Sequence, residues 1–126
     1  VLFLRRLDAG GLNWETHALS ADFNAGNTRA VVVDDVDGDG QKDLAFTTWE
    51  AEGKHGVLWL EFDQSPMETM WIPHQISGKE AGIKYDRIEM IDLDADGDRD
   101  LLTCEEQEGP SGRGLGVVWY ENPYAP

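Results

Sequence analysis

Two stretches of ten residues decide how this chain is interpreted. Residues 35–44 read Asp-Val-Asp-Gly-Asp-Gly-Gln-Lys-Asp-Leu, and residues 92–101 read Asp-Leu-Asp-Ala-Asp-Gly-Asp-Arg-Asp-Leu. Each places aspartates at alternate positions, follows them with a glycine, and ends in an Asp-Leu pair that begins an apolar run. The two stretches start 57 residues apart. Self-similarity at a fixed interval is the sequence signature of a repeat architecture.

The repeat extends beyond the acidic stretches. The same interval of 57 residues links Trp14 to Trp71 and His17 to His74. An apolar run with an aromatic third residue also occurs three times, at residues 1–4 (Val-Leu-Phe-Leu), 57–60 (Val-Leu-Trp-Leu) and 117–120 (Val-Val-Trp-Tyr). The repeat therefore accounts for most of the chain.

Each repeat predicts four short strands. These runs are rich in Val, Ile, Trp and Thr and are bounded by Gly, Asp and Pro, which favours strands. No stretch sustains the apolar stripe of an amphipathic helix. The predicted strands are, in the order first to fourth, 30–34 and 87–91, then 44–48 and 101–104, then 1–4, 57–60 and 117–120, and finally 14–19 and 71–76.

We therefore expect an all-β fold made of β-propeller blades, because four antiparallel strands repeated at this interval are typical of them. The chain is expected to be a single propeller segment: residues 1–20 as the last two strands of a blade, 21–77 as a complete blade, and 78–126 as the first three strands of the next. A blade buries its faces only against neighbours, so about two blades cannot close a ring. Either the segment belongs to a larger ring, which we favour, or neighbouring chains complete it.

The charge of the chain is strongly negative. Its 126 residues include 25 Asp and Glu against 10 Lys and Arg, a formal net charge of −15. Such a surface repels nucleic acid and anionic membranes. Apolar runs are no longer than four residues, which excludes a membrane-spanning helix. Part of the excess charge is a solvated coat, but the rest lies in the two aspartate clusters, where only a cation relieves the repulsion.

The acidic stretches predict two calcium sites. Alternate spacing in a tight loop lets three carboxylates converge, and a glycine then permits a sharp turn. Hard oxygen ligands suit Ca²⁺ better than Zn²⁺, which prefers nitrogen and sulfur. The predicted ligands of the first site are the side chains of Asp35, Asp37, Asp39 and Asp43 with the carbonyl of Gln41, and those of the second are Asp92, Asp94, Asp96 and Asp100 with the carbonyl of Asp98.

These loops differ from EF-hands. An EF-hand has Glu at the twelfth position and helices on both sides. Here the twelfth residues are Phe46 and Thr103, and apolar strand sequence follows each loop. We expect each cation to stabilise the turn between two strands by converting carboxylate repulsion into a cross-link.

The pattern Asp-x-Asp-x-Asp-Gly-x-x-Asp-Leu, leading into a strand at this interval, resembles the FG-GAP or VCBS repeat family. Residues 116–123 (Gly-Val-Val-Trp-Tyr-Glu-Asn-Pro) are also similar to members of that family from secreted bacterial proteins. The Phe-Gly and Gly-Ala-Pro landmarks are absent, which favours the VCBS-like branch over an integrin-like one. The resemblance implies a calcium-bearing propeller, typically seven-bladed, that is secreted, extracellular or periplasmic in a bacterium. It indicates the scaffold better than the activity.

Other residues with chemical potential receive structural interpretations. His17 and His74 recur at the same point of the repeat, and recurrence favours a structural role over catalysis. The single cysteine, Cys104, lies in an apolar run and is interpreted as a small core residue. The recurring tryptophans are interpreted as packing residues: Trp14, Trp59, Trp71 and Trp119.

One loop offers a remote catalytic possibility. Trp49 has no aromatic counterpart in the repeat and lies, with Glu50, Glu105 and Glu106, just past a second strand. A pair of acids for glycoside chemistry is imaginable there, but an exposed acidic loop is the preferred interpretation. We therefore predict no catalytic residue and no organic cofactor.

The function expected from the sequence is that of a non-enzymatic extracellular module for adhesion, glycan binding or protein assembly. Its expected partners are a glycan or a protein ligand, and further blades of the same chain or further copies of it. Two alternatives remain open. The chain is a propeller segment of a secreted polysaccharide-active enzyme, or it is a self-assembling structural subunit.

Overall fold

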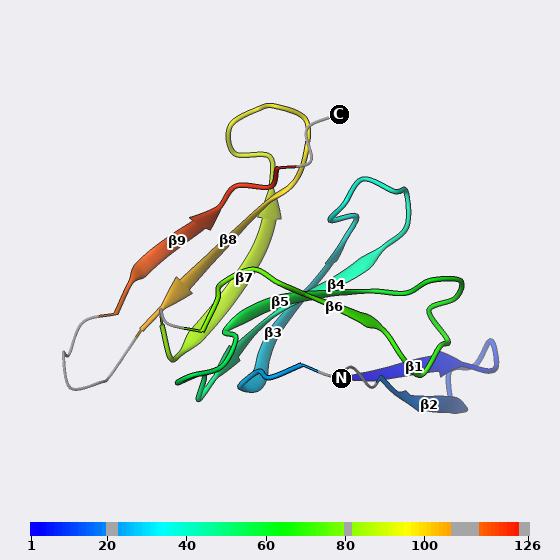
Figure 1. Cartoon of the computed structure of the whole chain (residues 1–126). Coiled ribbons are helices and arrows are strands. Elements are labelled where there is room, and N and C mark those ends of the chain that lie inside the picture. The colour runs from blue at the N-terminus through cyan, green and yellow to red at the C-terminus, as the bar shows by residue number, and fades with distance from the viewer. Residues whose placement is uncertain (20–22, 80–81, 107–113, 124–126) are drawn as a thin grey trace.

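The computed structural model describes residues 1–19, 23–79, 82–106 and 114–123. Within these ranges all regular structure is β, in nine strands that form three antiparallel sheets, and there is no helix (Figure 1). The all-β expectation is confirmed. The strands are β1 (Leu2–Arg6), β2 (Trp14–Ala18), β3 (Asn27–Asp34), β4 (Asp43–Trp49), β5 (Val57–Glu61), β6 (Ile72–Gln75), β7 (Tyr85–Ile91), β8 (Asp100–Glu105) and β9 (Gly116–Tyr120).

Each sheet is a simple meander in which a strand pairs with the next one in sequence. The sheets are β1-β2, β3-β4-β5-β6 and β7-β8-β9, which matches the two, four and three strands expected along the chain. The first strands of the four-stranded and three-stranded sheets, β3 and β7, begin earlier than predicted, at Asn27 and Tyr85. Each contains a register shift near its start. In the described residues the three sheets do not close into a ring (Figure 1).

The two inner strands of the four-stranded sheet, β4 and β5, are buried on both faces. Side chains of a strand alternate between faces, and in β4 both sets are buried: Phe46 on one face, Ala45 and Thr47 on the other. The register pairs Ala45 with Trp59 and Phe46 with Leu58, so β5 continues the same alternation. This sheet therefore lies in the middle of the molecule and supports two separate cores.

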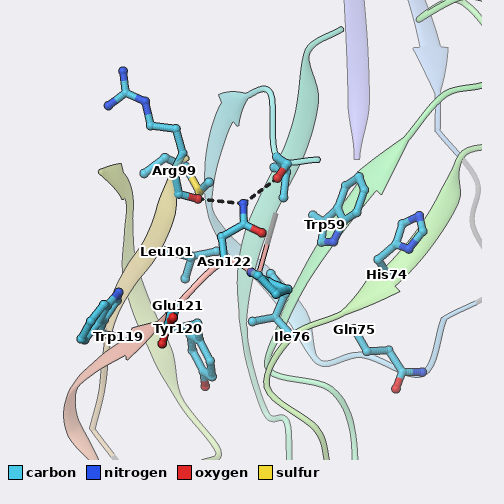
Figure 2. A pocket seen from close by; sticks show the side chains of 13 residues that line it. Trp59, His74, Gln75, Ile76, Arg99, Leu101, Trp119, Tyr120, Glu121 and Asn122 are labelled. Atoms are coloured by element: carbon cyan, nitrogen blue, oxygen red, sulfur yellow. Dashed lines mark hydrogen bonds between the residues drawn. The ribbon is translucent and has the colours of Figure 1, made fainter. Parts of the chain in front are cut away.

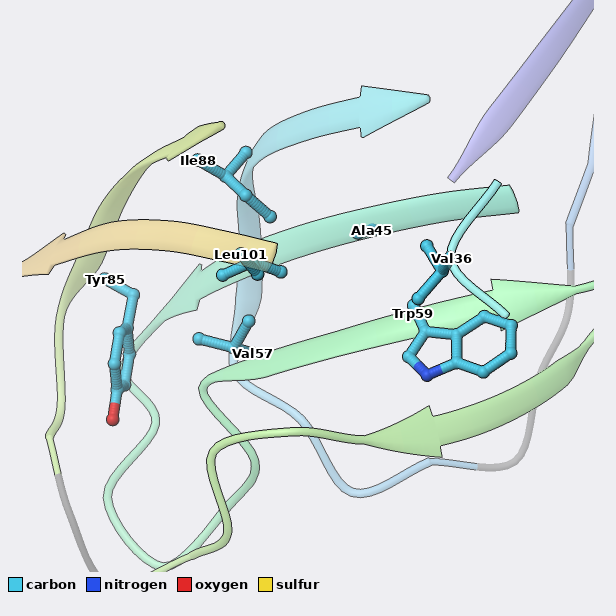
Figure 3. Close-up of a cluster of buried hydrophobic side chains, with 7 residues drawn as sticks. All are labelled: Val36, Ala45, Val57, Trp59, Tyr85, Ile88 and Leu101. Carbon is cyan, nitrogen blue, oxygen red and sulfur yellow. The ribbon is translucent and has the colours of Figure 1, made fainter. Parts of the chain in front are cut away.

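The first core lies between the four-stranded and three-stranded sheets (Figure 3). Strand β7 contacts β3 and β4 there. The ring of Tyr85 is fully buried, and Gly56 lies so close to it that a Cβ at Gly56 would overlap the ring. The core consists of Val36, Ala45, Val57, Trp59, Tyr85, Ile88 and Leu101. Burying each of the larger apolar side chains contributes about 1.5–3 kcal/mol.

The second core covers the opposite face of the four-stranded sheet. The ring of Trp71 packs edge-on against Phe62, with ring centroids 5.1 Å apart. The buried members of this second core are Phe46, Leu58, Leu60 and Trp71. The partly buried residues Leu19, Phe23, Ala25, Leu44 and Phe62 pack against them. Leu19, Phe23 and Ala25, which follow β2, thus cover this face, whereas β1 and β2 themselves are largely exposed.

Candidate metal centres

Each acidic loop connects the first two strands of a sheet. Residues 35–42 join β3 to β4, and residues 92–99 join β7 to β8. The ladder pair Asp34–Asp43 closes the first loop, and Ile91–Asp100 closes the second. The sequence therefore located both loops correctly, at equivalent places in two sheets.

The first loop brings three carboxylates together. Asp35, Asp37 and Asp39 each offer an oxygen atom, and these oxygens lie within 4.8 Å of one another. The backbone amides of Gly38 and Gly40 donate to Asp35 Oδ1 and Oδ2 at 2.8 and 3.0 Å. Both glycines have positive φ, 77° and 90°, a conformation that favours glycine. The turn thus directs backbone amides toward the acidic cluster and holds it in place.

Gln41 adds two hydrogen bonds within the first loop. Its backbone amide donates to Asp39 Oδ1 at 2.7 Å, and its side-chain amide donates to Asp39 Oδ2 at 2.8 Å. The Asp39 amide in turn donates to Asp37 Oδ1 at 3.1 Å. The predicted role of the Gln41 carbonyl as a ligand stays a prediction.

The second loop repeats the cluster with weaker internal support. Oxygens of Asp92, Asp94 and Asp96 lie within 4.8 Å of one another. The amides of Asp96 and Asp98 donate to Asp94 Oδ1 and Asp96 Oδ1 at 3.3 and 3.2 Å. Ala95 occupies the position of Gly38 and also has positive φ, 65°. This backbone is strained for a residue with a Cβ.

Asp98 distinguishes the second loop from the first. The residue is 9% exposed, and both carboxylate oxygens are buried without a hydrogen-bond partner. Burial, followed by repulsion from the neighbouring carboxylates, raises the pKa of Asp98. A buried carboxylate is costly unless it is paired or coordinates a metal. The sequence assigned only the backbone carbonyl of Asp98 a role, so it missed this side chain.

The geometry of both clusters fits a hard divalent cation. Calcium binds oxygen atoms at about 2.4 Å, so two oxygens on one ion are at most about 4.8 Å apart. The separations within both carboxylate groups meet this limit. Carboxylate oxygens are also the ligands that calcium prefers. The donor sets therefore suit Ca²⁺, with the three alternating aspartates of each loop as the central ligands.

The ninth-position aspartates lie at the base of their loops. Asp43 is buried and accepts a hydrogen bond from the Val36 amide at 2.8 Å. Burial, together with the repulsion of the loop carboxylates, raises the pKa of Asp43 to about 6. Asp100 accepts from the amides of Leu93 at 3.0 Å and Asn122 at 2.9 Å. Burial opposes ionisation of Asp100, but these hydrogen bonds outweigh it and lower its pKa.

Asn122 connects the two loops, as the dashed lines of Figure 2 show. Its side-chain amide donates to the carbonyl of Val36 in the first loop at 2.7 Å and to that of Arg99 in the second at 3.1 Å. The sequence reasoning included Asn122 only in the run 116–123 and gave it no role. Asn122 stands where the preceding copy of the run has Phe62. A polar residue at an otherwise apolar position was the signal that could have indicated a role.

A charged contact adds to this connection. Asp34, the last residue of β3, lies 2.9 Å from the Nζ of Lys42 and 3.8 Å from the Nε of Arg99. Although partial burial opposes it, the hydrogen bond from Lys42 lowers the pKa of Asp34. The second loop thus places the guanidinium group of Arg99 beside the first loop. The sequence did not predict a role for Lys42 or Arg99.

The two recurring histidines lie against β1 and β5, the strands formed by the repeated apolar run. His74 stacks on Trp59 with ring centroids 4.0 Å apart, and its Nε2 lies 3.2 Å from Glu61. His17 lies 6.3 Å from Phe3, centroid to centroid, and pairs with it in the register. These contacts agree with a packing role. Cys104 is half-buried and absent from both core clusters.

The acidic residues near Trp49 do not form one exposed loop. Glu105 is buried, and its carboxylate accepts hydrogen bonds from the amides of Ile83, Lys84 and Leu115 at 2.8, 3.2 and 2.7 Å. The expectation of an exposed loop was therefore wrong for Glu105. Three backbone donors engage this carboxylate, which gives it a structural role at the end of β8.

Comparisons with protein-family models, curated proteins and solved structures find no match to this chain. The described residues contain no helix long and apolar enough to cross a membrane.

Proposed function

We propose that this chain is a calcium-stabilised β-propeller segment that acts as a non-enzymatic extracellular module for adhesion, glycan binding or protein assembly. One observation carries the calcium assignment. Two carboxylate clusters occupy equivalent loops in two sheets, and in the second the buried carboxylate of Asp98 has no hydrogen-bond partner. A bound cation supplies the missing positive charge.

The way the sheets pack supports the propeller assignment. Val57 and Trp59 lie at the interface with the three-stranded sheet and are 0% and 8% exposed. Their counterparts in β9, Val117 and Trp119, are 75% and 44% exposed. The registers agree, because Thr47 pairs with Val57 as Cys104 pairs with Val117. By analogy with Val57 and Trp59, we expect a further sheet to cover the face of β9 that carries Val117 and Trp119.

The cations would act on the strand connections. Each loop holds several like charges between two paired strands, and repulsion among them opposes the closed turn. Calcium bound by Asp35, Asp37 and Asp39, or by Asp92, Asp94 and Asp96, supplies charge neutralisation at that turn. Affinities of about 10⁻⁴–10⁻³ M, typical of extracellular modules, would match millimolar calcium outside the cell.

Thermal unfolding with calcium and with a chelator tests the assignment. We expect the melting temperature to rise with calcium, and calorimetric titration to give two binding events. Asp37→Ala and Asp94→Ala should each remove one event, whereas Asp63→Ala, an exposed acid outside the loops, should leave both. Identical melting curves with and without calcium would overturn the proposal.

A further inference from the structure

The two acidic loops differ in charge at their seventh position. Aspartates at the first, third, fifth and ninth positions match in both loops, but the first loop has Gln41 at the seventh position where the second has Asp98. The first loop therefore carries four of these carboxylates and the second carries five: Asp35, Asp37, Asp39 and Asp43 against Asp92, Asp94, Asp96, Asp98 and Asp100.

The extra carboxylate is buried beside the other acids of its loop. Asp98 is 9% exposed, and both of its side-chain oxygens lack a hydrogen-bond partner within the described residues. Repulsion from the carboxylates of Asp96, Asp100, Asp94 and Asp92 acts on it. A buried carboxylate is costly unless a cation pairs with it or coordinates it. The charge of Asp98 therefore increases what the second loop gains from a bound cation.

The first loop, by contrast, offsets part of its charge without a cation. The backbone amides of Gly38 and Gly40 donate to the two oxygens of Asp35 at 2.8 and 3.0 Å. The side-chain amide of Gln41 donates to Asp39 Oδ2 at 2.8 Å. Hydrogen bonds to an ionised oxygen stabilise the charged form of the group. The carboxylates of the first loop therefore gain less when a cation binds.

The second loop lacks this compensation. Its first aspartate, Asp92, has a buried Oδ1 with no hydrogen-bond partner in the described part of the chain. The ionised side chain of Asp98 cannot donate a hydrogen bond as that of Gln41 does. Asp34, which precedes the first loop, does not reverse the difference, because the Nζ of Lys42 lies 2.9 Å from its Oδ1. Uncompensated negative charge is therefore greater in the second loop.

We propose that the two calcium sites are unequal and fill in order, the second loop first, because the carboxylate of Asp98 adds its charge to the second site. The affinity of oxygen-ligand calcium sites is tuned by the number of charged ligands. As calcium rises, the β7–β8 connection is stabilised at a lower concentration than the β3–β4 connection. This inference rests on the proposed calcium function and deepens it, since it gives the module two calcium thresholds.

Calorimetric titration of calcium into the full chain, freed of divalent ions, tests the order of filling. We expect two dissociation constants that differ at least about tenfold. Asp94→Ala should remove the tighter event, and Asp37→Ala should remove the weaker one. At a calcium concentration between the two constants, hydrogen exchange should slow at the amides of residues 92–100 and stay unchanged at those of residues 35–43.

An exchange of the seventh residues tests the role of Asp98. Asp98→Asn keeps the shape of the side chain and should raise the dissociation constant of the tighter site about tenfold. Gln41→Asp should lower that of the weaker site. Gln41→Ala removes the hydrogen bond to Asp39 without adding a charge, so it should strengthen the first site less than Gln41→Asp does. Asp63→Asn, at an exposed acid outside both loops, is the control and should change neither constant.

Three results would overturn this inference and leave two calcium sites in place: equal constants for the two events, loss of the tighter event in Asp37→Ala, or unchanged constants in Asp98→Asn. A melting curve of Asp98→Asn in a chelator that is no lower than that of the natural chain would show that a weakened site is not a folding defect. Absence of all calcium binding would instead overturn the proposed function itself.

Discussion

The side-chain amide of Asn122 donates a hydrogen bond to the carbonyl of Val36 at 2.7 Å, across 86 residues of sequence. The same amide group donates to the carbonyl of Arg99, and the backbone amide of Asn122 donates to Asp100. One residue therefore links two acidic loops that belong to different sheets. Together with the contact between Arg99 and Asp34, this link fixes the position of the two loops relative to each other.

Replacing Asn122 should destabilise the fold. Asn122→Ala leaves two carbonyl acceptors without their donor, which should lower the free energy of unfolding by about 1–3 kcal/mol. Asn122→Asp should cost at least as much, because an ionised carboxylate cannot donate and would face two carbonyl oxygens. Urea denaturation in calcium measures both. Asn27→Ala, which removes an exposed contact to Glu50, is the control, and an equal loss there would show that the link is not special.

Asp98 should respond in opposite directions with and without calcium. In a chelator, Asp98→Asn removes a buried charge that has no partner, so the melting temperature should rise. In calcium the same change removes a negative charge beside the second cluster, so the calcium-induced shift should shrink. Asp63→Asn, at an exposed acid outside both loops, is the control and should leave the calcium response unchanged. A lower melting temperature for Asp98→Asn in the chelator would contradict the prediction.

The first glycine of each loop offers a reciprocal pair of substitutions. Gly38 has φ 77°, and a Cβ added there would meet no atom within 4 Å, so Gly38→Ala should cost about 1 kcal/mol from backbone strain alone. Ala95 has φ 65° at the same place in the second loop. Ala95→Gly should therefore stabilise the chain by up to about 1 kcal/mol. Chemical denaturation in a chelator compares them, and the same sign for both changes would refute the assigned strain.

Asp43 should make calcium-free stability fall as the pH rises. Its pKa is about 6 in the folded chain and about 3.9 when unfolded. Between these values the folded state binds more protons, so the stabilising contribution is complete below about pH 4 and is lost as the pH passes about 6. We expect a loss on the order of 1–2 kcal/mol.

The Asp43→Asn variant isolates this contribution, because an amide does not titrate but its oxygen can still accept from the Val36 amide. In a chelator, denaturation curves from about pH 4 to about pH 7 should have a smaller slope for the variant than for the natural chain. Asp100, whose pKa is lowered, contributes with the opposite sign, mainly below about pH 4. Equal slopes for the two proteins would show that Asp43 is not the titrating group.

The strands and loops were predictable because their signals are local. Apolar runs such as residues 57–60 alternate faces within one strand, and Asp-Gly turns have the same consequence wherever they occur. The interval of 57 residues then placed equivalent loops in two sheets. Even so, the first strands start earlier than predicted, because the register shifts near Thr28 and Tyr85 leave no mark in hydrophobic alternation.

By itself, the sequence determined the nine strands, their grouping and the position of both carboxylate clusters, since each depends on residues close together in the chain. Only the tertiary structure decided that Asn122 joins the two loops, that Glu105 is buried among three amides, and that Asp34 lies beside Arg99. These features depend on which sheet faces lie against each other. That arrangement is set by packing between residues far apart in sequence, which no local pattern records.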